Sequence, residues 1–202
     1  MARIQSVCVY CGAARGSDPI FTDEARRLGE AIARDGLRLV YGGGGIGLMG
    51  EVAAAVAKAG GAVTGIIPEF LMSRERAFGY AAEMIVTADM HERKRLMFER
   101  ADAFVALPGG VGTLEELVEQ LTWAQLGRHR KPILIANIAG FWDPFLALID
   151  HMRANAFIHG NNPVKLLVAE TADEILPKLQ AAVKDLPDDL EGPTARAVVE
   201  RM

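Results

Sequence analysis

A glycine-rich segment, Pro108 to Glu116, has the residue types and the spacing that best suit chemistry. It follows the apolar stretch Ala103–Leu107, which is typical of a buried strand, and it leads into apolar residues spaced three and four apart, as in an amphipathic helix. Glycines between a strand and a helix let backbone N–H groups approach an anion at the helix N-terminus, where the helix dipole also favours negative charge. Glu116 follows one turn later. The segment therefore predicts a phosphate site beside a carboxylate.

Thr113 and Glu116 also allow a purely structural interpretation. Thr-x-x-Glu is the pattern of a capping box, in which two side chains satisfy free N–H groups at the start of a helix. The spacing alone does not decide between a helix cap and a catalytic carboxylate.

A charged cluster, His91-Glu92-Arg93-Lys94-Arg95, lies in the first turns of another expected helix. One interpretation is a solvated surface on a helix that begins with a capping box formed by Asp89 and Glu92. Cations at a helix N-terminus oppose the helix dipole, however, so three of them are better explained if an anion, or Glu116, lies opposite. Arginine suits such a pair because its planar guanidinium binds a carboxylate or a phosphate through two hydrogen bonds.

A second glycine cluster, Gly42 to Gly50, satisfies the G-x-G-x-x-G pattern of dinucleotide-binding proteins, and Glu69 follows about 20 residues further on. The cluster follows the second expected strand rather than the first, and the loop before Glu116 competes for the phosphate. A nicotinamide or flavin dinucleotide is therefore one alternative ligand. Close backbone approach or tight helix–strand packing explains these glycines equally well.

The chain has two cysteines, Cys8 and Cys11, in a C-x-x-C pattern. Redox chemistry of the thioredoxin type needs that pattern at a helix N-terminus, but Cys8 lies inside an expected strand and Cys11 points to the opposite face. Two cysteines cannot complete a structural zinc site, and the histidines form no ligand pattern. We expect structural roles for both cysteines, no metal, no cofactor, and a cytoplasmic location because there is no disulfide framework.

Apolar stretches and amphipathic stretches alternate along the chain, which predicts a doubly wound, Rossmann-like α/β fold with helices on both faces of a parallel sheet. Both glycine clusters follow strands, at the carboxyl ends where ligands bind in this architecture. Strands are expected at Val7–Tyr10, Leu37–Tyr41, Val63–Ile67, Glu83–Thr87, Ala103–Leu107, Ile133–Ala136 and Leu166–Val168. Helices are expected at Phe21–Arg34, Leu48–Lys58, Met90–Arg100, Leu114–Leu126, Pro144–Ala154 and Ala172–Val183.

Length and charge limit the classes of partner. The 202 residues suit a single domain, which we place at residues 1–184, followed by a tail at 185–202 that is rich in Asp, Glu and Pro and has a short helix at Ala195–Arg201. The net charge of −4 gives no basic surface for nucleic acid, and the apolar runs are too short to cross a membrane. We therefore expect neither nucleic acid nor a membrane as partner.

Several ordered motifs resemble the Lonely Guy (LOG) family of cytokinin riboside 5′-monophosphate phosphoribohydrolases, whose relatives were long mislabelled lysine decarboxylases. The segment 108–116 matches the family signature PGGxGTxxE, and the resemblance extends from about Ser6 to Val168, without the tail. The other matching motifs are Tyr41-Gly42-Gly43-Gly44, Gly47-Leu48-Met49-Gly50, Met90-His91-Glu92-Arg93-Lys94 and Thr122-Trp123-Ala124-Gln125-Leu126-Gly127.

The resemblance implies hydrolysis of the N-glycosidic bond of an adenosine 5′-monophosphate, N6-prenylated or plain, to the free base and ribose 5-phosphate. It also implies a homodimer, and a catalytic pair of Arg93 and Glu116 in which the arginine orients the glutamate and keeps it ionised. The implied substrate contacts are Glu75, Lys94, Gly109, Gly110, Val111, Gly112, Thr113, Leu114 and Glu115.

Three points stay open at the level of the sequence. Family members often have serines where this chain has Ala13 and Ala14, so the hydroxyl contact to substrate is in doubt there, and Arg15 is a candidate replacement. The group that protonates the departing purine is not identified. A non-catalytic carrier of a nucleotide or of molybdenum cofactor on the same fold is the alternative function.

Overall fold

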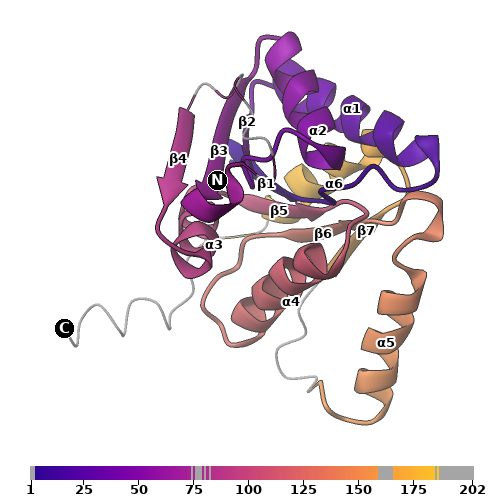
Figure 1. Ribbon diagram of the computed structural model, residues 1–202. Coiled ribbons are helices and arrows are strands. Elements are labelled where there is room, and N and C mark those ends of the chain that lie inside the picture. The colour runs from indigo at the N-terminus through magenta and orange to yellow at the C-terminus, as the bar shows by residue number, and fades with distance from the viewer. Residues whose placement is uncertain are drawn as a thin grey trace.

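The computed structural model describes residues 3–73, 75, 79, 81, 83–158, 166–184 and 186, in which strands and helices alternate (Figure 1). The strands are β1 (Ser6–Tyr10), β2 (Arg38–Tyr41), β3 (Ala62–Pro68), β4 (Glu83–Thr87), β5 (Ala103–Ala106), β6 (Ile133–Ala136) and β7 (Leu166–Ala169). The α-helices are α1 (Pro19–Arg34), α2 (Gly47–Lys58), α3 (Met90–Glu99), α4 (Val111–Gln125), α5 (Asp143–Ala154) and α6 (Ala172–Val183). Short 3₁₀ turns lie at Glu69–Leu71 and Ile138–Gly140. Each strand and helix expected between Val7 and Val183 is confirmed, with small differences at the ends.

The strands form one parallel sheet in the order β4-β3-β2-β1-β5-β6-β7. From β1 the chain adds strands toward one edge as far as β4, and from β5 it adds strands toward the other edge. The order therefore reverses between β1 and β5, where the loops that follow these neighbouring strands diverge and leave a crevice. The Gly12 N–H donates to the Pro108 carbonyl over 3.1 Å, which ties the two loops together at their bases.

Helices cover both faces of the sheet, as Figure 1 shows, and each face has its own apolar core. Val7 and Val9 of β1 point to the face under α1, α2 and α6, while Cys8 and Tyr10 point to the face under α3 and α4. Cys11 belongs to the first core, so the two cysteines lie on opposite faces as expected. Both thiols are free, and burial raises their pKa well above the ordinary value, which favours the unreactive thiol.

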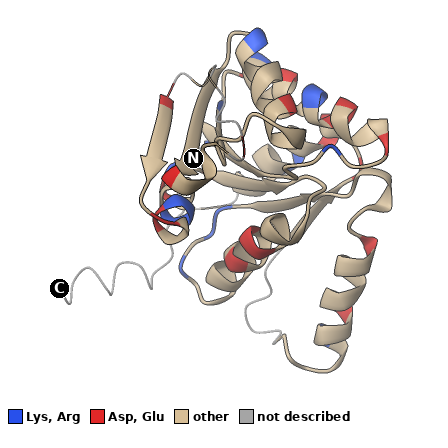
Figure 2. Ribbon diagram, in the orientation of Figure 1, with Lys and Arg blue, Asp and Glu red and all other residues tan. Residues whose placement is uncertain are grey.

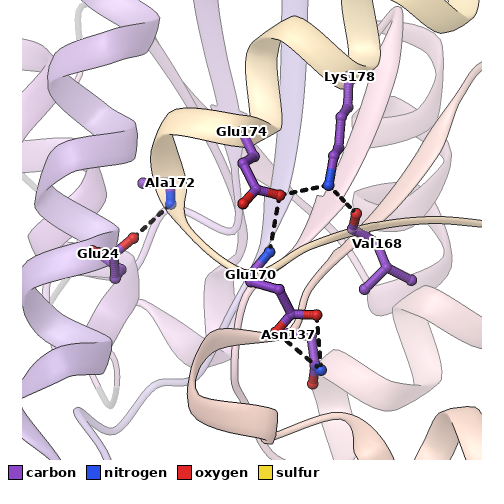
Figure 3. A network of polar contacts seen from close by, with 7 residues as sticks. All are labelled: Glu24, Asn137, Val168, Glu170, Ala172, Glu174 and Lys178. Atoms are coloured by element: carbon purple, nitrogen blue, oxygen red, sulfur yellow. Dashed lines mark hydrogen bonds and ion pairs between the residues drawn. The ribbon is translucent and has the colours of Figure 1, made fainter.

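A buried carboxylate joins the first helix to the last. Glu24 of α1 is 6% exposed and accepts a hydrogen bond from the Ala172 N–H, the first residue of α6 (Figure 3). Thr171 precedes that residue but makes no capping hydrogen bond with its side chain. Glu24 therefore supplies a capping interaction to a helix whose first residue lies 148 residues away in the sequence.

We expect Glu24→Ala to lower the free energy of unfolding by about 1–2 kcal/mol, because it leaves a buried N–H without its acceptor. The measurement is the urea midpoint. Glu30→Ala, at an exposed position of the same helix, is the matched control and should change stability by less than about 0.5 kcal/mol. Equal losses in the two variants would contradict the capping role.

Several expectations concern residues outside the described part of the chain. These are the tail from residue 187 on, with its proposed helix at Ala195–Arg201, and His159. In the described residues, no helix combines the length and the hydropathy that a membrane span requires.

Candidate active site

A cavity of about 200 Å³ lies at the carboxyl ends of the central strands. Its walls come from the loops after β1, β2, β3 and β5 and from the first turns of α3 and α4. The lining residues are Val9, Tyr10, Cys11, Ala13, Gly42, Met49, Glu75, Met90, Arg93, Met97, Gly110, Gly112, Thr113, Glu115 and Glu116. Both residues of the expected catalytic pair thus face one cavity.

The start of α4 has the features of an anion site. Gly110 is the N-cap residue and makes no capping hydrogen bond, and Leu114 is the first residue whose N–H donates back to it, over 3.0 Å. In the described chain, no atom lies within 4 Å of a Cβ placed on Gly110 or Gly112. Neither glycine has a positive φ. Packing and backbone conformation therefore do not require these glycines, whereas an anion close to the backbone would.

The start of α4 also decides between the two interpretations of Thr113 and Glu116. Because α4 begins at Val111, three residues before the expected Leu114, Thr113 is its third residue and Glu116 its sixth. A capping box needs the threonine at the N-cap, so that interpretation is wrong. The capping role of Asp89 is confirmed, since its carboxylate accepts from the Glu92 N–H over 2.8 Å.

The second glycine cluster does not offer a comparable site. The Leu48 N–H at the start of α2 donates to the Gly12 carbonyl over 2.9 Å, so the loop after β1 occupies this helix terminus. A Cβ on Gly47 would collide with Ala13, and a Cβ on Gly50 would collide with the Gly45 backbone. These glycines permit close packing within the protein, which accounts for the G-x-G-x-x-G pattern without a dinucleotide.

Glu116 is a buried carboxyl group with 9% of its surface exposed. Burial raises its pKa to about 7, the nearby Arg93 guanidinium lowers it, and Glu115 and Glu75 raise it again. Desolvation thus outweighs the arginine, which acts in the expected direction by lowering the pKa of Glu116 but does not return it to the ordinary value of a carboxyl group. A carboxyl group with a pKa near 7 is well suited to accept a proton during catalysis.

Arg93 is held rigidly in the cavity wall. Its Nε donates to the Ile66 carbonyl over 3.2 Å and its Nη2 donates to the Gly42 carbonyl over 3.1 Å. These carbonyls belong to β3 and to the loop after β2, so the guanidinium bridges two strand ends. A Cβ on Gly42 would overlap the guanidinium, which explains why glycine is needed at that position. The buried cation therefore has a fixed place beside Glu116.

Lys94 does not line the cavity but acts on a residue that does. Its Nζ lies 2.7 Å from Glu115 Oε1 and 3.1 Å from Glu119 Oε1, both on α4. The two carboxylates outweigh the effect of burial and raise the pKa of the lysine. Figure 2 shows the basic residues of α3 and the acidic residues of α4 on adjacent parts of the molecule. Lys94 thus connects α3 to α4 beside the cavity.

The structure separates the other expected substrate contacts. Glu75, Gly110, Gly112, Thr113 and Glu115 line the cavity with the catalytic pair. Gly109 lines a neighbouring cavity, Val111 is 84% exposed, and Leu114 lines a groove on the other side of α4. Since α4 begins before Leu114, the side chains of its first turn point in different directions rather than along one loop.

Sequence reasoning missed part of the cavity wall. Tyr10, Met49, Met90 and Met97 come from three different elements, β1, α2 and α3, and supply its aromatic and apolar surface. Cys11 also lines the cavity, in addition to its packing role. Tyr10 and the loop before Met49 could have been predicted, because they lie at the carboxyl ends of β1 and β2, where ligands bind in this architecture.

Two further expectations concern charged and metal-binding groups. Arg15 Nη2 lies 2.6 Å from Glu51 Oε1, and the arginine lines the neighbouring cavity beside Gly109. Arg15 is therefore paired within the protein. No group of His, Cys, Asp and Glu residues in the described chain is arranged to hold a metal ion.

Comparison with known proteins identifies close relatives. Residues 49–179 match the family model described as "Possible lysine decarboxylase". The cytokinin riboside 5′-monophosphate phosphoribohydrolase LOG of Oryza sativa subsp. japonica is 47% identical over 91% of this chain and 76% of its own length. The cytokinin riboside 5′-monophosphate phosphoribohydrolase LOG5 of Arabidopsis thaliana is 45% identical over 89% of this chain and 79% of its own length.

Two solved structures with the same fold are more distant in sequence. The molybdenum cofactor binding protein of Rippkaea orientalis superposes with a TM-score of 0.67 at 22% identity, over 90% of this chain and 99% of that chain. The Moco carrier protein of Chlamydomonas reinhardtii gives a TM-score of 0.68 at 21% identity, over 91% and 100% of the two chains. At this identity the likeness shows the shared α/β fold alone.

Proposed function

The chain belongs to the Lonely Guy family, whose named relatives are cytokinin riboside 5′-monophosphate phosphoribohydrolases, and we propose that it hydrolyses the N-glycosidic bond of adenosine 5′-monophosphates. The products are the free base, N6-prenylated or plain, and ribose 5-phosphate. The observation that carries this proposal is a buried carboxyl group, Glu116, one and a half turns from an uncapped helix N-terminus in the same cavity. This arrangement suits a phosphorylated sugar whose reactive carbon lies a short distance from its phosphate.

The phosphate binds at the start of α4. Its charge is favoured by the helix dipole and by the N–H groups of Val111, Gly112 and Thr113, and the absence of side chains at Gly110 and Gly112 leaves room for it. The bound phosphate then holds the ribose in the cavity with C1′ near Glu116. Positioning of this kind lowers the barrier because the reacting groups need no further ordering.

Glu116 takes a proton from the attacking water, and its negative charge stabilises the oxocarbenium-like sugar as the bond to the base breaks. Arg93 lies close enough to lower the pKa of Glu116 and favours the ionised form that the reaction needs. The apolar surface of Met49, Met90 and Met97 suits a purine with an apolar substituent, since methionine side chains adapt to irregular shapes.

The experiment is an assay of base release from AMP and from isopentenyladenosine 5′-monophosphate. We expect release from both, with the higher kcat/KM for the prenylated nucleotide. Binding of either nucleotide without release of the base would favour a carrier function, which the shared fold with molybdenum cofactor carriers keeps as the alternative. Purified protein and chromatography of the products are sufficient.

The pKa of Glu116 leads to a prediction about pH. Because the ionised carboxylate is the active form and its pKa is raised to about 7, kcat/KM should rise as the pH increases through about 7. In Glu115→Gln, which removes one of the charges that raise this pKa, the midpoint should move to lower pH. A rate that is constant from pH 5 to 8, or an unmoved midpoint in the variant, would contradict the assignment.

We also propose that two copies of the chain associate through α4 and α5. A groove of about 350 Å³ lies between these helices, and its wall is mostly apolar. Figure 1 shows α5 extending away from the sheet, and none of its residues is buried in the described chain. Val118 and Leu148 face the groove and are 41% and 47% exposed. Apolar surface of this kind on two adjacent helices favours a second copy packed across it.

Light scattering at micromolar concentration should give twice the 21.8 kDa mass of one chain. Leu148→Glu should lower the mass to that of one chain, because association would bury the new charge. Glu99→Lys, at an exposed position of α3 that does not line the groove, is the control and should leave the mass unchanged. A mass near 21.8 kDa for the unaltered protein would exclude the dimer.

A further inference from the structure

The cavity contains a second carboxyl group that the steps described above do not use. Glu75 follows the 3₁₀ turn after β3 and lines the cavity. Its backbone is fixed on both sides, since its N–H donates to the Leu71 carbonyl over 2.9 Å and its carbonyl accepts from the Gly45 N–H over 2.8 Å. The residue therefore has a defined position beside the catalytic pair.

The side chain of Glu75 has an unusual environment for a carboxyl group. Within the described chain, its Oε2 is buried and has no hydrogen-bond partner, and a Cβ on Gly44 would lie only 3.2 Å from that oxygen. A buried carboxylate without a partner is costly, and the group avoids the cost by keeping its proton or by meeting a ligand. Burial raises its pKa, although Arg93 lowers it.

Glu75 and Glu116 also influence each other. The charge of Glu75 is one of the causes that raise the pKa of Glu116, so the two carboxyl groups resist being ionised together. Two carboxyl groups coupled in this way lose their protons in separate steps. Glycoside hydrolases use two carboxyl groups in this way, one as a general base or nucleophile and the other as the acid that protonates the leaving group.

Hydrolysis of the nucleotide requires that acid, because a purine leaves poorly as an anion. We propose that Glu75 is the general acid of this reaction, donating its proton to a ring nitrogen of the departing purine while Glu116 accepts a proton from water. The C1′–N bond breaks with its electron pair going to the purine, the water oxygen bonds to C1′, and the products are the neutral base and ribose 5-phosphate. Glu75 ends ionised, Glu116 ends protonated, and exchange with solvent restores both. The inference rests on the proposed hydrolase function.

Three substrates test the role of Glu75 in the variant Glu75→Gln. AMP has an exocyclic amine, and its purine must be protonated by an acid in order to leave. Purine riboside 5′-monophosphate lacks the amine, but its purine must still be protonated. 4-Nitrophenyl riboside 5-phosphate has no such amine and releases nitrophenolate, which leaves without protonation. We expect kcat/KM to fall roughly 10²-fold or more for both purines, while the nitrophenyl compound is hydrolysed within about threefold of the unaltered rate. Glu69→Gln, an exposed neighbour outside the cavity, is the control and should not change any rate.

Each other outcome overturns the role. A loss for AMP alone would mean that Glu75 binds the exocyclic amine. An equal loss for all three substrates, as expected for Glu116→Gln, would mean that Glu75 only maintains the shape of the site. Unchanged rates for all three would mean that it takes no part. If the unaltered protein released no base from any of them, the hydrolase function itself would be wrong, which is a different result from a failure of Glu75→Gln alone.

Discussion

Glu116→Gln is expected to lower kcat for nucleotide hydrolysis by roughly 10²-fold or more while the protein still binds the nucleotide. The amide has the same shape as the carboxyl group but can neither accept the proton of water nor offset the positive charge of the sugar. Since Glu116 is the sixth residue of α4 and not part of a cap, its replacement removes no helix-capping interaction. Initial rates and a binding titration on the same preparation give the two quantities.

Stability provides the control for this variant. The pKa of Glu116 is raised on folding, so its contribution to stability is present at low pH and is lost as the pH rises through about 7. Above that pH the buried carboxylate destabilises the fold, by as much as about 3 kcal/mol. Glu116→Gln should therefore be at least as stable as the unaltered protein at pH 8. Full activity in a well-folded variant would contradict the mechanism.

Removal of the 5′-phosphate from the substrate should have a comparably large effect. Isopentenyladenosine should be hydrolysed with a kcat/KM lower by on the order of 10³-fold than that of its 5′-monophosphate, because the phosphate holds the sugar in position and its binding energy supports the reaction at C1′. Steady-state rates for the two compounds measure the ratio. Equal values would mean that the glycines at the start of α4 have no role in binding the phosphate.

The variant Gly112→Ala tests whether the ratio of kcat/KM for the nucleotide and the nucleoside depends on the glycines at the start of α4. A Cβ at Gly112 meets no atom of the described chain, so the variant should fold normally, and alanine favours a helix over glycine by up to about 1 kcal/mol. The added methyl group enters the space proposed for the phosphate. We expect the variant to lose activity on the nucleotide and to keep its low activity on the nucleoside, so that the two rates approach each other. An equal loss of activity on the nucleotide and on the nucleoside would mean that the methyl group does not act at the phosphate position.

The strands and helices could be predicted from the sequence because the residue patterns that indicate them are local. Central strands of a parallel sheet are covered on both faces and read as short apolar runs, such as Ala103–Ala106 and Ile133–Ala136. The start of α4 was placed too late because Val111-Gly112-Thr113 is a poor helix-forming sequence, and the turn is shaped for a ligand rather than for helix propensity.

The site was predicted in part. The signature motif indicated the glycine turn and Glu116, but the cavity wall depends on β1 lying next to β5, which no local pattern specifies. Tyr10 and Met97, for example, meet in the cavity from elements far apart in the sequence. The raised pKa of Glu116 follows from burial by the assembled fold, and for this reason Arg93 appeared to be dominant when only the sequence was considered.

One measurement tests the central claim most directly. The purified protein, in molar excess over isopentenyladenosine 5′-monophosphate, is incubated for a series of times, and the free base, ribose 5-phosphate and remaining nucleotide are quantified by chromatography. We predict that base and ribose 5-phosphate appear together in equal amounts as the nucleotide disappears. Recovery of the bound nucleotide intact at all times would contradict the account and would identify the protein as a carrier.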